Sequence, residues 1–144
     1  MTRLRIATVG VGPDAQSRST RHIETIAKLH DMYELCAFCD RDPERLKEAG
    51  AQFGVDALHT DLQQMLDKEK PDVVYRLTPK DSIGPVCLAI LKAGSHLINE
   101  IPIGETLAMA DALIDAAKRN NVKHEVAENV WCWPEELLKA NIAR

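Results

Sequence analysis

Short apolar runs alternate along the chain with longer segments in which apolar residues recur every three or four positions. The short runs are typical of buried strands, and the longer spacing is typical of helices with one buried face. The predicted strands are residues 4–9, 33–39, 57–59, 72–77, 96–100 and 123–127. The predicted helices begin near residues 19, 43, 60, 82 and 106, and a short final helix follows the last strand. Thr60 is the expected N-cap of the third helix.

This strict alternation predicts an α/β fold with a doubly wound parallel sheet, which is a Rossmann-like architecture. Right-handed crossovers between parallel strands place helices on both faces of such a sheet. About six strands in this rhythm fit the spatial order 3-2-1-4-5-6. We expect residues 1–130 to form one domain and residues 131–144 to form a C-terminal helical tail.

Composition limits the classes of protein that fit this pattern. The 144 residues suffice for one domain with a core, and 45% apolar and 28% charged residues are ordinary globular values. The 18 basic and 22 acidic residues give a net charge of −4, so nothing favours binding to nucleic acid or to an anionic membrane. No apolar run is long enough to cross a bilayer, and the N-terminus lacks the pattern of a signal peptide. We therefore expect a cytoplasmic protein.

A glycine-rich turn directly follows the first predicted strand. Residues 10–15 match G-x-G-x-x-[G/A], with Gly10, Gly12 and Ala15 at the small positions. The first glycine permits a tight turn, the second lets a pyrophosphate approach the backbone, and the third small residue lets helix and strand pack closely. Free N–H groups at the start of the next helix favour an anion. The turn therefore predicts a dinucleotide-binding domain over residues 1–130.

Two residues of the turn depart from an ideal phosphate site. Pro13, a candidate cofactor-binding residue by its place in the turn, offers no N–H. Asp14 adds a negative charge near the predicted phosphate position, which Arg18 or Arg21 could offset. A tight turn that binds no ligand is the alternative interpretation.

Asp40 ends the second predicted strand, where an acidic residue can accept hydrogen bonds from an adenosine ribose. Its charge would repel a 2′-phosphate, so it favours NAD over NADP. Arg41 weakens this preference, because a guanidinium there could accommodate a 2′-phosphate or lie against the adenine. Asp40 could instead be the N-cap of the next helix, or it could have both roles.

The pair Cys36 and Cys39 forms a C-x-x-C, which could indicate a redox pair or half a metal site. Both cysteines lie in a predicted buried strand, and residues three apart on a strand point to opposite faces. We therefore interpret them as small buried apolar residues. His124 and Glu125 do not form H-E-x-x-H, and no metal site is predicted.

Two further breaks lie at the carboxyl ends of predicted strands, where open α/β sheets bind ligands. They are Thr78-Pro79 and the segment that contains Glu100 and Pro102. With the glycine turn, residues 40–42 and residues 93–96, these motifs resemble the N-terminal domain of the glucose–fructose oxidoreductase/inositol dehydrogenase (Gfo/Idh/MocA) family. The resemblance covers nearly the whole chain. It implies an NAD(P)-dependent enzyme of sugars, cyclitols and related alcohols, with a second α/β domain.

The chain departs from this family at the positions that carry its chemistry. The family's Glu-Lys-Pro motif has a lysine that assists proton transfer at the substrate hydroxyl, and here that position is Ile101. Isoleucine can neither donate nor accept a proton. A family histidine four residues after the proline of the Thr-Pro motif is Ile83. The sequence also stops at Arg144, where the resemblance implies the crossover into the second domain. We therefore name no catalytic residue.

The tail between Trp131 and Ile142 concentrates apolar side chains after the last predicted strand. Exposed, these side chains would suggest a homodimer or a partner domain, whereas folded back they would cover the sheet edge.

Three functions remain open from the sequence. The chain is an NAD(H)-binding module that does not catalyse hydride transfer alone, an NAD-dependent oxidoreductase completed by a missing segment or partner, or a non-enzymatic regulatory or scaffold module. Ile101 and the early end favour the first and third, and the glycine turn with Asp40 favours those that bind NAD.

Overall fold

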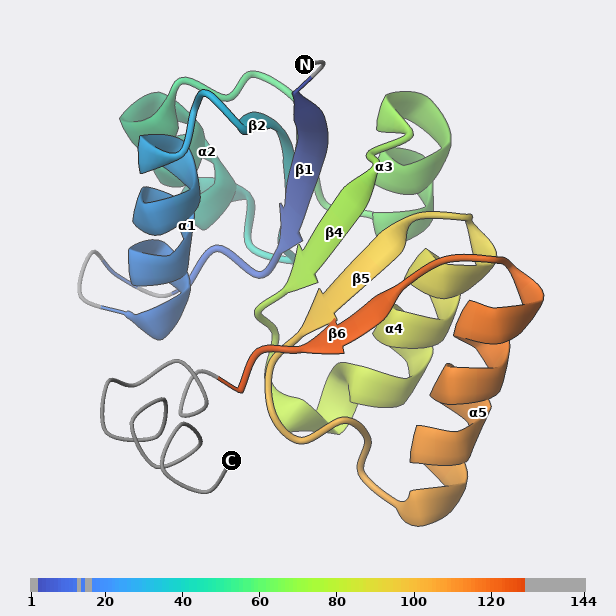
Figure 1. Ribbon diagram of the computed structural model, residues 1–144. Coiled ribbons are helices and arrows are strands. Elements are labelled where there is room, and N and C mark those ends of the chain that lie inside the picture. The colour runs from blue at the N-terminus through green and yellow to red at the C-terminus, as the bar shows by residue number, and fades with distance from the viewer. Residues whose placement is uncertain (1–2, 13, 15–16, 129–144) are drawn as a thin grey trace, which may run out of the picture.

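Six parallel strands form one sheet in the order β3-β2-β1-β4-β5-β6 (Figure 1). The computed structural model describes residues 3–12, 14 and 17–128. The strands are β1 (Leu4–Val9), β2 (Tyr33–Cys39), β3 (Leu58–His59), β4 (Val73–Arg76), β5 (His96–Asn99) and β6 (His124–Val126). The order reverses between β1 and β4, which places a crevice above the carboxyl ends of these two strands. The predicted strand order is confirmed.

Helices cover both faces of the sheet, as the pattern predicts (Figure 1). On one face lie α1 (Arg18–Lys28) and α2 (Pro43–Phe53), whose buried residues pack with Phe38 of β2 and Ile6 of β1. On the other lie α3 (Leu62–Glu69), α4 (Ile83–Lys92) and α5 (Leu107–Arg119), which pack on Ala7 and Val74. A 3₁₀ turn, Lys80–Ser82, precedes α4. The predicted doubly wound α/β fold is therefore confirmed.

The two cysteines of the C-x-x-C motif face the same side of the sheet, so the prediction of opposite faces is wrong. The register of β1 against β2 shifts at Cys36, because Ile6 pairs with Leu35 whereas Ala7 pairs with Ala37. This bulge adds one residue to β2 and shifts the alternation of its side chains. As a result, Cys36 and Cys39 both pack in the core under α3, α4 and α5.

Two helix starts differ from their predicted caps by one or two residues. Asp42, not Asp40, caps α2: its Oδ1 accepts the N–H groups of Glu44 at 3.0 Å and Arg45 at 3.3 Å. For α3 the cap is Asp61, not Thr60, and it accepts from Gln64 N at 2.7 Å. Aspartate is a strong N-cap at either site, so local preference alone does not decide between neighbours. Asp40 is thereby free of a capping role.

We expect Asp42→Ala to lower the free energy of unfolding by about 1 kcal/mol, because two amides at the start of α2 lose their acceptor. Lys47→Ala, an exposed substitution on the same helix, serves as the control and should change stability by less than about 0.5 kcal/mol. Urea denaturation followed by circular dichroism measures both. Equal midpoints for the two variants would contradict the assignment of Asp42 as the cap.

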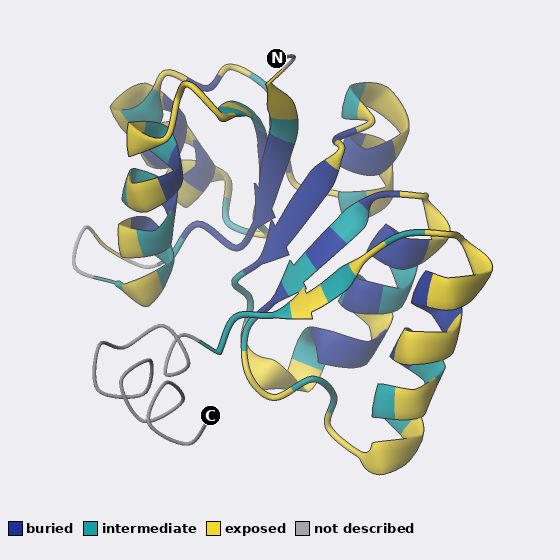
Figure 2. Ribbon diagram, viewed as in Figure 1, coloured by how far each residue is buried: buried dark blue, intermediate teal, exposed yellow. Residues whose placement is uncertain are grey.

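The far end of the sheet is less covered than its centre. Figure 2 shows β1 and β4 largely buried, whereas β6 is half-buried or exposed. On the α1 side of the sheet, the part of the chain that the structure describes leaves a cavity of about 700 Å³ between α1, β4 and the end of β6. Within residues 3–128, apart from the gaps at 13 and 15–16, no helix has the length and apolar character needed to cross a membrane. The predicted tail, residues 131–144, lies outside the described residues.

Candidate functional site

The turn after β1 has two positions that only glycine can occupy, because a Cβ at either one would clash with its neighbours. Gly10 has φ +92°, and a Cβ built there would lie 2.9 Å from the carbonyl carbon of Leu77. Gly12 has φ +87°, and its Cβ would lie 2.1 Å from Ser17 Oγ. Positive φ and this close approach both exclude larger residues. At these two positions no side chain covers the backbone of the turn at the crevice, which is the arrangement that a pyrophosphate site requires.

Asp40 holds this turn in place through its two carboxylate oxygens. Its Oδ2 accepts the N–H of Val11 at 3.0 Å, and its Oδ1 accepts the N–H of Asp42 at 3.1 Å. The Gly10 N–H donates to Cys39 O at 2.8 Å, so the turn is fixed to the end of β2 at two points. Each carboxylate oxygen has a second lone pair for another donor. Asp40 can thus anchor the turn and also accept a ribose hydroxyl.

A pocket of about 590 Å³ opens at this edge of the sheet, between the glycine turn and the start of α4. Six of the predicted cofactor-binding residues line it: Gly10, Gly12, Asp40, Arg41, Thr78 and Pro79. Arg45, Asp61 and Ser82, which no sequence motif marks as ligand-binding, line it as well. Two predicted residues, Pro13 and Ala15, lie outside the described residues. The pocket joins residues from three strand ends into one candidate dinucleotide site.

A buried arginine, which the sequence motifs do not predict, supports the Thr78-Pro79 turn. Arg76, only 1% exposed, donates from Nη2 to the carbonyl oxygens of Thr78 at 2.6 Å and Pro79 at 2.9 Å. Its Nε donates to Thr78 Oγ1 at 3.1 Å. The only signal of this role in the sequence is that Arg76 is a charged residue inside an otherwise apolar strand. A charged residue is buried in such a strand only when its donors have hydrogen-bond acceptors.

Asn99 links this arginine to the next loop. Its Oδ1 accepts from Arg76 Nη1 at 2.6 Å, and its Nδ2 donates to the carbonyl oxygens of Pro102 and Ile103, each at 3.2 Å. Asn99 is fully buried. The loops after β4 and β5, which both border the crevice, are therefore connected through one buried pair of side chains.

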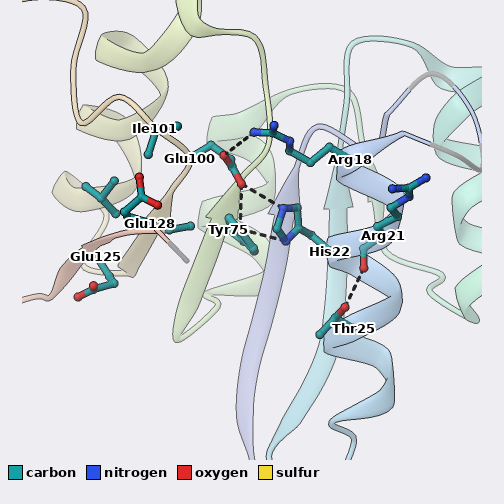
Figure 3. Close-up of a pocket in the computed structure, with 11 residues that line it drawn as sticks. Arg18, Arg21, His22, Thr25, Tyr75, Glu100, Ile101, Glu125 and Glu128 are labelled. Carbon is teal, nitrogen blue, oxygen red and sulfur yellow. Dashed lines mark hydrogen bonds and ion pairs between the residues drawn. The ribbon is translucent and has the colours of Figure 1, made fainter. Parts of the chain in front are cut away.

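Glu100 does not line the dinucleotide pocket with the other predicted residues. Its carboxylate points into the neighbouring cavity of about 700 Å³, where it meets side chains of α1 and β4 (Figure 3). It pairs with Arg18 Nη1 at 3.2 Å and with His22 Nε2 at 3.1 Å, and it accepts from Tyr75 Oη at 3.3 Å. Arg18, which the sequence analysis gave with Arg21 as a possible offset for the charge of Asp14, thus pairs with Glu100. Ile101 lies on the rim of this cavity and is 51% exposed.

Tyr75 is a neutral donor in this cluster. Its burial, and secondarily the charge of Glu100, raises the pKa of its hydroxyl, so the phenol keeps its proton at neutral pH. The Oη also lies 3.3 Å from His22 Nδ1, and the two rings meet edge to face at 5.2 Å. These contacts fix the position of Glu100 at the end of β5. Ile83, the other departure from the family pattern, is fully buried at the start of α4.

The three cysteines that the structure describes are free thiols. Burial raises the pKa of Cys36 to about 11, and of Cys39 and Cys87 to about 12. Because only the thiolate is nucleophilic, such thiols are unreactive near neutral pH. No group of three or more histidine, cysteine or carboxylate side chains with metal-binding geometry occurs in the described part of the chain.

We expect these three thiols to react with iodoacetamide at pH 8 at least about a hundredfold more slowly in the folded chain than in guanidinium chloride. Peptide mapping by mass spectrometry measures each cysteine separately, and the unfolded chain is the control. Rapid labelling of Cys39 or Cys87 in the folded protein would show that their sites open to solvent.

Comparison with known proteins identifies relatives along nearly the whole chain. A model of an oxidoreductase family, described as having an NAD-binding Rossmann fold, matches residues 4–128. D-apiose dehydrogenase of Paraburkholderia graminis is 37% identical over 69% of this chain and 26% of its own length. A glycosyl hydrolase family 109 protein of Shewanella pealeana is 28% identical over 100% of this chain and 32% of its own length. The chain therefore spans about a third of the curated relatives it matches.

Solved structures agree with this relationship. The WlbA dehydrogenase of Bordetella pertussis, solved with NADH and UDP-GlcNAcA, has a TM-score of 0.89 and 26% identity over 99% of this chain and 42% of its own. The scyllo-inositol dehydrogenase of Lactobacillus casei has a TM-score of 0.87 over 99% of this chain and 41% of its own, and at 21% identity it is similar in fold. The chain belongs to this oxidoreductase family and folds as its NAD-binding Rossmann domain.

Proposed function

We propose that this chain binds NAD(H) in the pocket above β1 and β4, and that it does not carry out hydride transfer alone. The observation that supports binding is the pocket itself, in which Asp40 fixes a glycine turn that has no room for a Cβ. In this arrangement the bare backbone of Gly10 and Gly12 faces the pyrophosphate. Thr78 and Pro79 form the opposite wall. Bound NAD⁺ supplies the hydride acceptor, and the residues of the chain bind and orient it.

Charge at the adenosine end supports NAD over NADP. Asp40 would repel a 2′-phosphate while accepting hydrogen bonds from the ribose. Arg41 and Arg45 line the same pocket, but Arg45 is already paired with Asp42 at 3.1 Å. The WlbA neighbour was solved with NADH, in agreement with this choice.

The absence of independent catalysis is supported by the side chains at the nicotinamide end. Ile101 stands where the family has a lysine and cannot transfer a proton. Ile83 stands where the family has a histidine, and it is buried and apolar. An oxidoreductase completed by a further segment or a partner is the second candidate, because the relatives include D-apiose dehydrogenase and the WlbA dehydrogenase.

Calorimetric titration tests the binding. We expect NADH to bind, and we expect Asp40→Asn to weaken it about tenfold, because the variant loses a charged acceptor at the ribose and the Val11 amide. We expect NADPH to bind the wild type more weakly than NADH, and the difference to shrink in the variant. Asp56→Asn, an exposed aspartate away from the pocket, is the matched control and should bind NADH normally. No binding at millimolar ligand would refute the proposal.

An activity assay tests the second half of the proposal. We expect no alcohol-dependent reduction of NAD⁺ by the pure 144-residue chain, and no gain with Ile101→Lys, since the lysine alone does not complete a substrate site. Absorbance at the NADH band over a panel of sugars and cyclitols provides the measurement. Reproducible turnover by the wild-type chain would favour the oxidoreductase instead.

A further inference from the structure

We propose that Asp42 makes the adenosine end of this site selective against NADP(H), by holding Arg45 away from the position of a 2′-phosphate. The inference rests on the proposed NAD(H) binding and deepens it, because it assigns the discrimination between the two cofactors to a residue that does not itself line the pocket. In this role Asp42 is a positioning residue, which acts on the ligand through Arg45.

Arg45 lies at the adenosine end of the pocket. It lines the pocket together with Asp40, which directly follows β2 and marks the ribose that carries the 2′-position. Arg45 belongs to the first turn of α2, and its side chain is 45% exposed, so a ligand can reach the guanidinium. A guanidinium binds a phosphate through charge-assisted hydrogen bonds from two N–H groups of its fork. Arg45 is therefore a potential ligand of a 2′-phosphate.

Asp42 occupies this guanidinium. Its Oδ2 lies 3.1 Å from Arg45 Nε. The carboxylate cannot follow the arginine toward a ligand, because its Oδ1 accepts the backbone N–H groups of Glu44 at 3.0 Å and Arg45 at 3.3 Å. The backbone N–H of Asp42 in turn donates to Asp40 Oδ1 at 3.1 Å. To turn its whole fork toward a phosphate, Arg45 must break its contact with a fixed carboxylate.

The charges that line the pocket show what this pairing changes. Four charged side chains line it, namely Arg41, Arg45, Asp40 and Asp61. Because Asp42 neutralises Arg45, Arg41 remains as the cation that opposes two carboxylates. A 2′-phosphate adds about two negative charges at neutral pH, so it meets a net negative surface. The 2′-hydroxyl of NADH carries no charge and meets no such repulsion.

The test removes the charge of Asp42 and keeps its cap. Asp42→Asn leaves an oxygen that accepts the N–H groups at the start of α2, because asparagine is as strong an N-cap as aspartate. Dissociation constants for NADPH and NADH are measured by calorimetry on the full chain. We expect NADPH to bind the variant about fivefold more tightly than the wild type, and we expect NADH affinity to change by less than about twofold.

Two further variants identify Arg45 as the cause. In the double variant Asp42→Asn/Arg45→Met the gain for NADPH should disappear, because the guanidinium that Asp42 releases is gone. Glu44→Gln removes the same charge at an exposed position of the first turn of α2, where the described residues form no ion pair with it. This control should change NADPH affinity by less than about twofold. A merely structural role of Asp42 would weaken both cofactors together and would not depend on Arg45.

The outcomes separate this inference from the proposed function. If the wild type and the variants bind neither cofactor, NAD(H) binding itself fails, and this inference fails with it. If NADH binds normally and Asp42→Asn gives no gain for NADPH, or the gain persists in the double variant, the inference is overturned and NAD(H) binding stands. Should Asp42→Asn not fold by circular dichroism, Asp42→Ser replaces it, because serine is also a strong N-cap and carries no charge to hold Arg45. The same gain for NADPH must then appear, and an unchanged affinity overturns the inference.

Discussion

Replacing Gly10 with alanine should abolish NADH binding and lower the free energy of unfolding by about 3 kcal/mol. The added Cβ meets backbone on the facing strand end, at 2.9 Å from Leu77 C and 3.0 Å from Thr78 N. Backbone cannot rotate away as a flexible side chain can, so β1 and β4 must separate at the crevice. The φ of +92° adds strain for any residue with a side chain. Both effects act on the turn that Asp40 anchors.

Gly54→Ala separates these two causes. Gly54 also has a positive φ, +69°, but a Cβ there meets no atom within 4 Å. We expect this variant to lose about 1 kcal/mol of stability and to bind NADH normally, because only the backbone conformation is strained. Thermal denaturation and calorimetry of both variants provide the comparison. Similar losses in the two proteins would mean that positive φ, rather than the contact with Leu77 and Thr78, makes Gly10 indispensable.

The sequence predicts those parts of the site that depend on local chemistry. A glycine turn between a strand and a helix, an acidic residue at the end of the second strand and a Thr-Pro break each have a recognisable pattern. Parallel alternation then brings their strand ends to one edge, and the pocket indeed joins Gly10, Asp40 and Thr78. Residue order alone was sufficient here, because the sheet topology is fixed by the alternation of strands and helices.

Features that depend on side-chain direction were not predictable. Glu100 was expected in the cofactor pocket, but its carboxylate turns toward His22 and Arg18 of α1, which are distant in sequence. The bulge at Cys36 reverses the expected alternation, and no turn residue marks it. In the sequence, Arg76 is a single charged residue within an apolar run. Its burial is explained only by the structure, in which Asn99 and two backbone carbonyls accept its hydrogen bonds. Each case depends on a long-range partner.

The second large effect concerns Asn99, whose replacement by alanine should cost about 3 to 5 kcal/mol. The substitution removes the acceptor of Arg76 Nη1, in a hydrogen bond that is closed to water, and the donor to the part-buried oxygens Pro102 O and Ile103 O. A buried charged donor left without an acceptor costs more than the hydrogen bond itself contributed. Because Asn99 joins the loops after β4 and β5, we also expect NADH affinity to fall in any variant that still folds.

Asn120→Ala provides the matched control, since Asn120 also donates from Nδ2, to Ala116 O at 2.8 Å, but at the exposed end of α5. Its loss should cost less than about 1 kcal/mol, because water replaces the missing partner. Urea unfolding of the two variants, read by circular dichroism, gives the difference directly. If Asn99→Ala were no more destabilising than Asn120→Ala, the buried connection between Arg76 and the Pro102 loop would contribute little to the fold. Arg76 would then need another reason to be buried beneath the pocket wall.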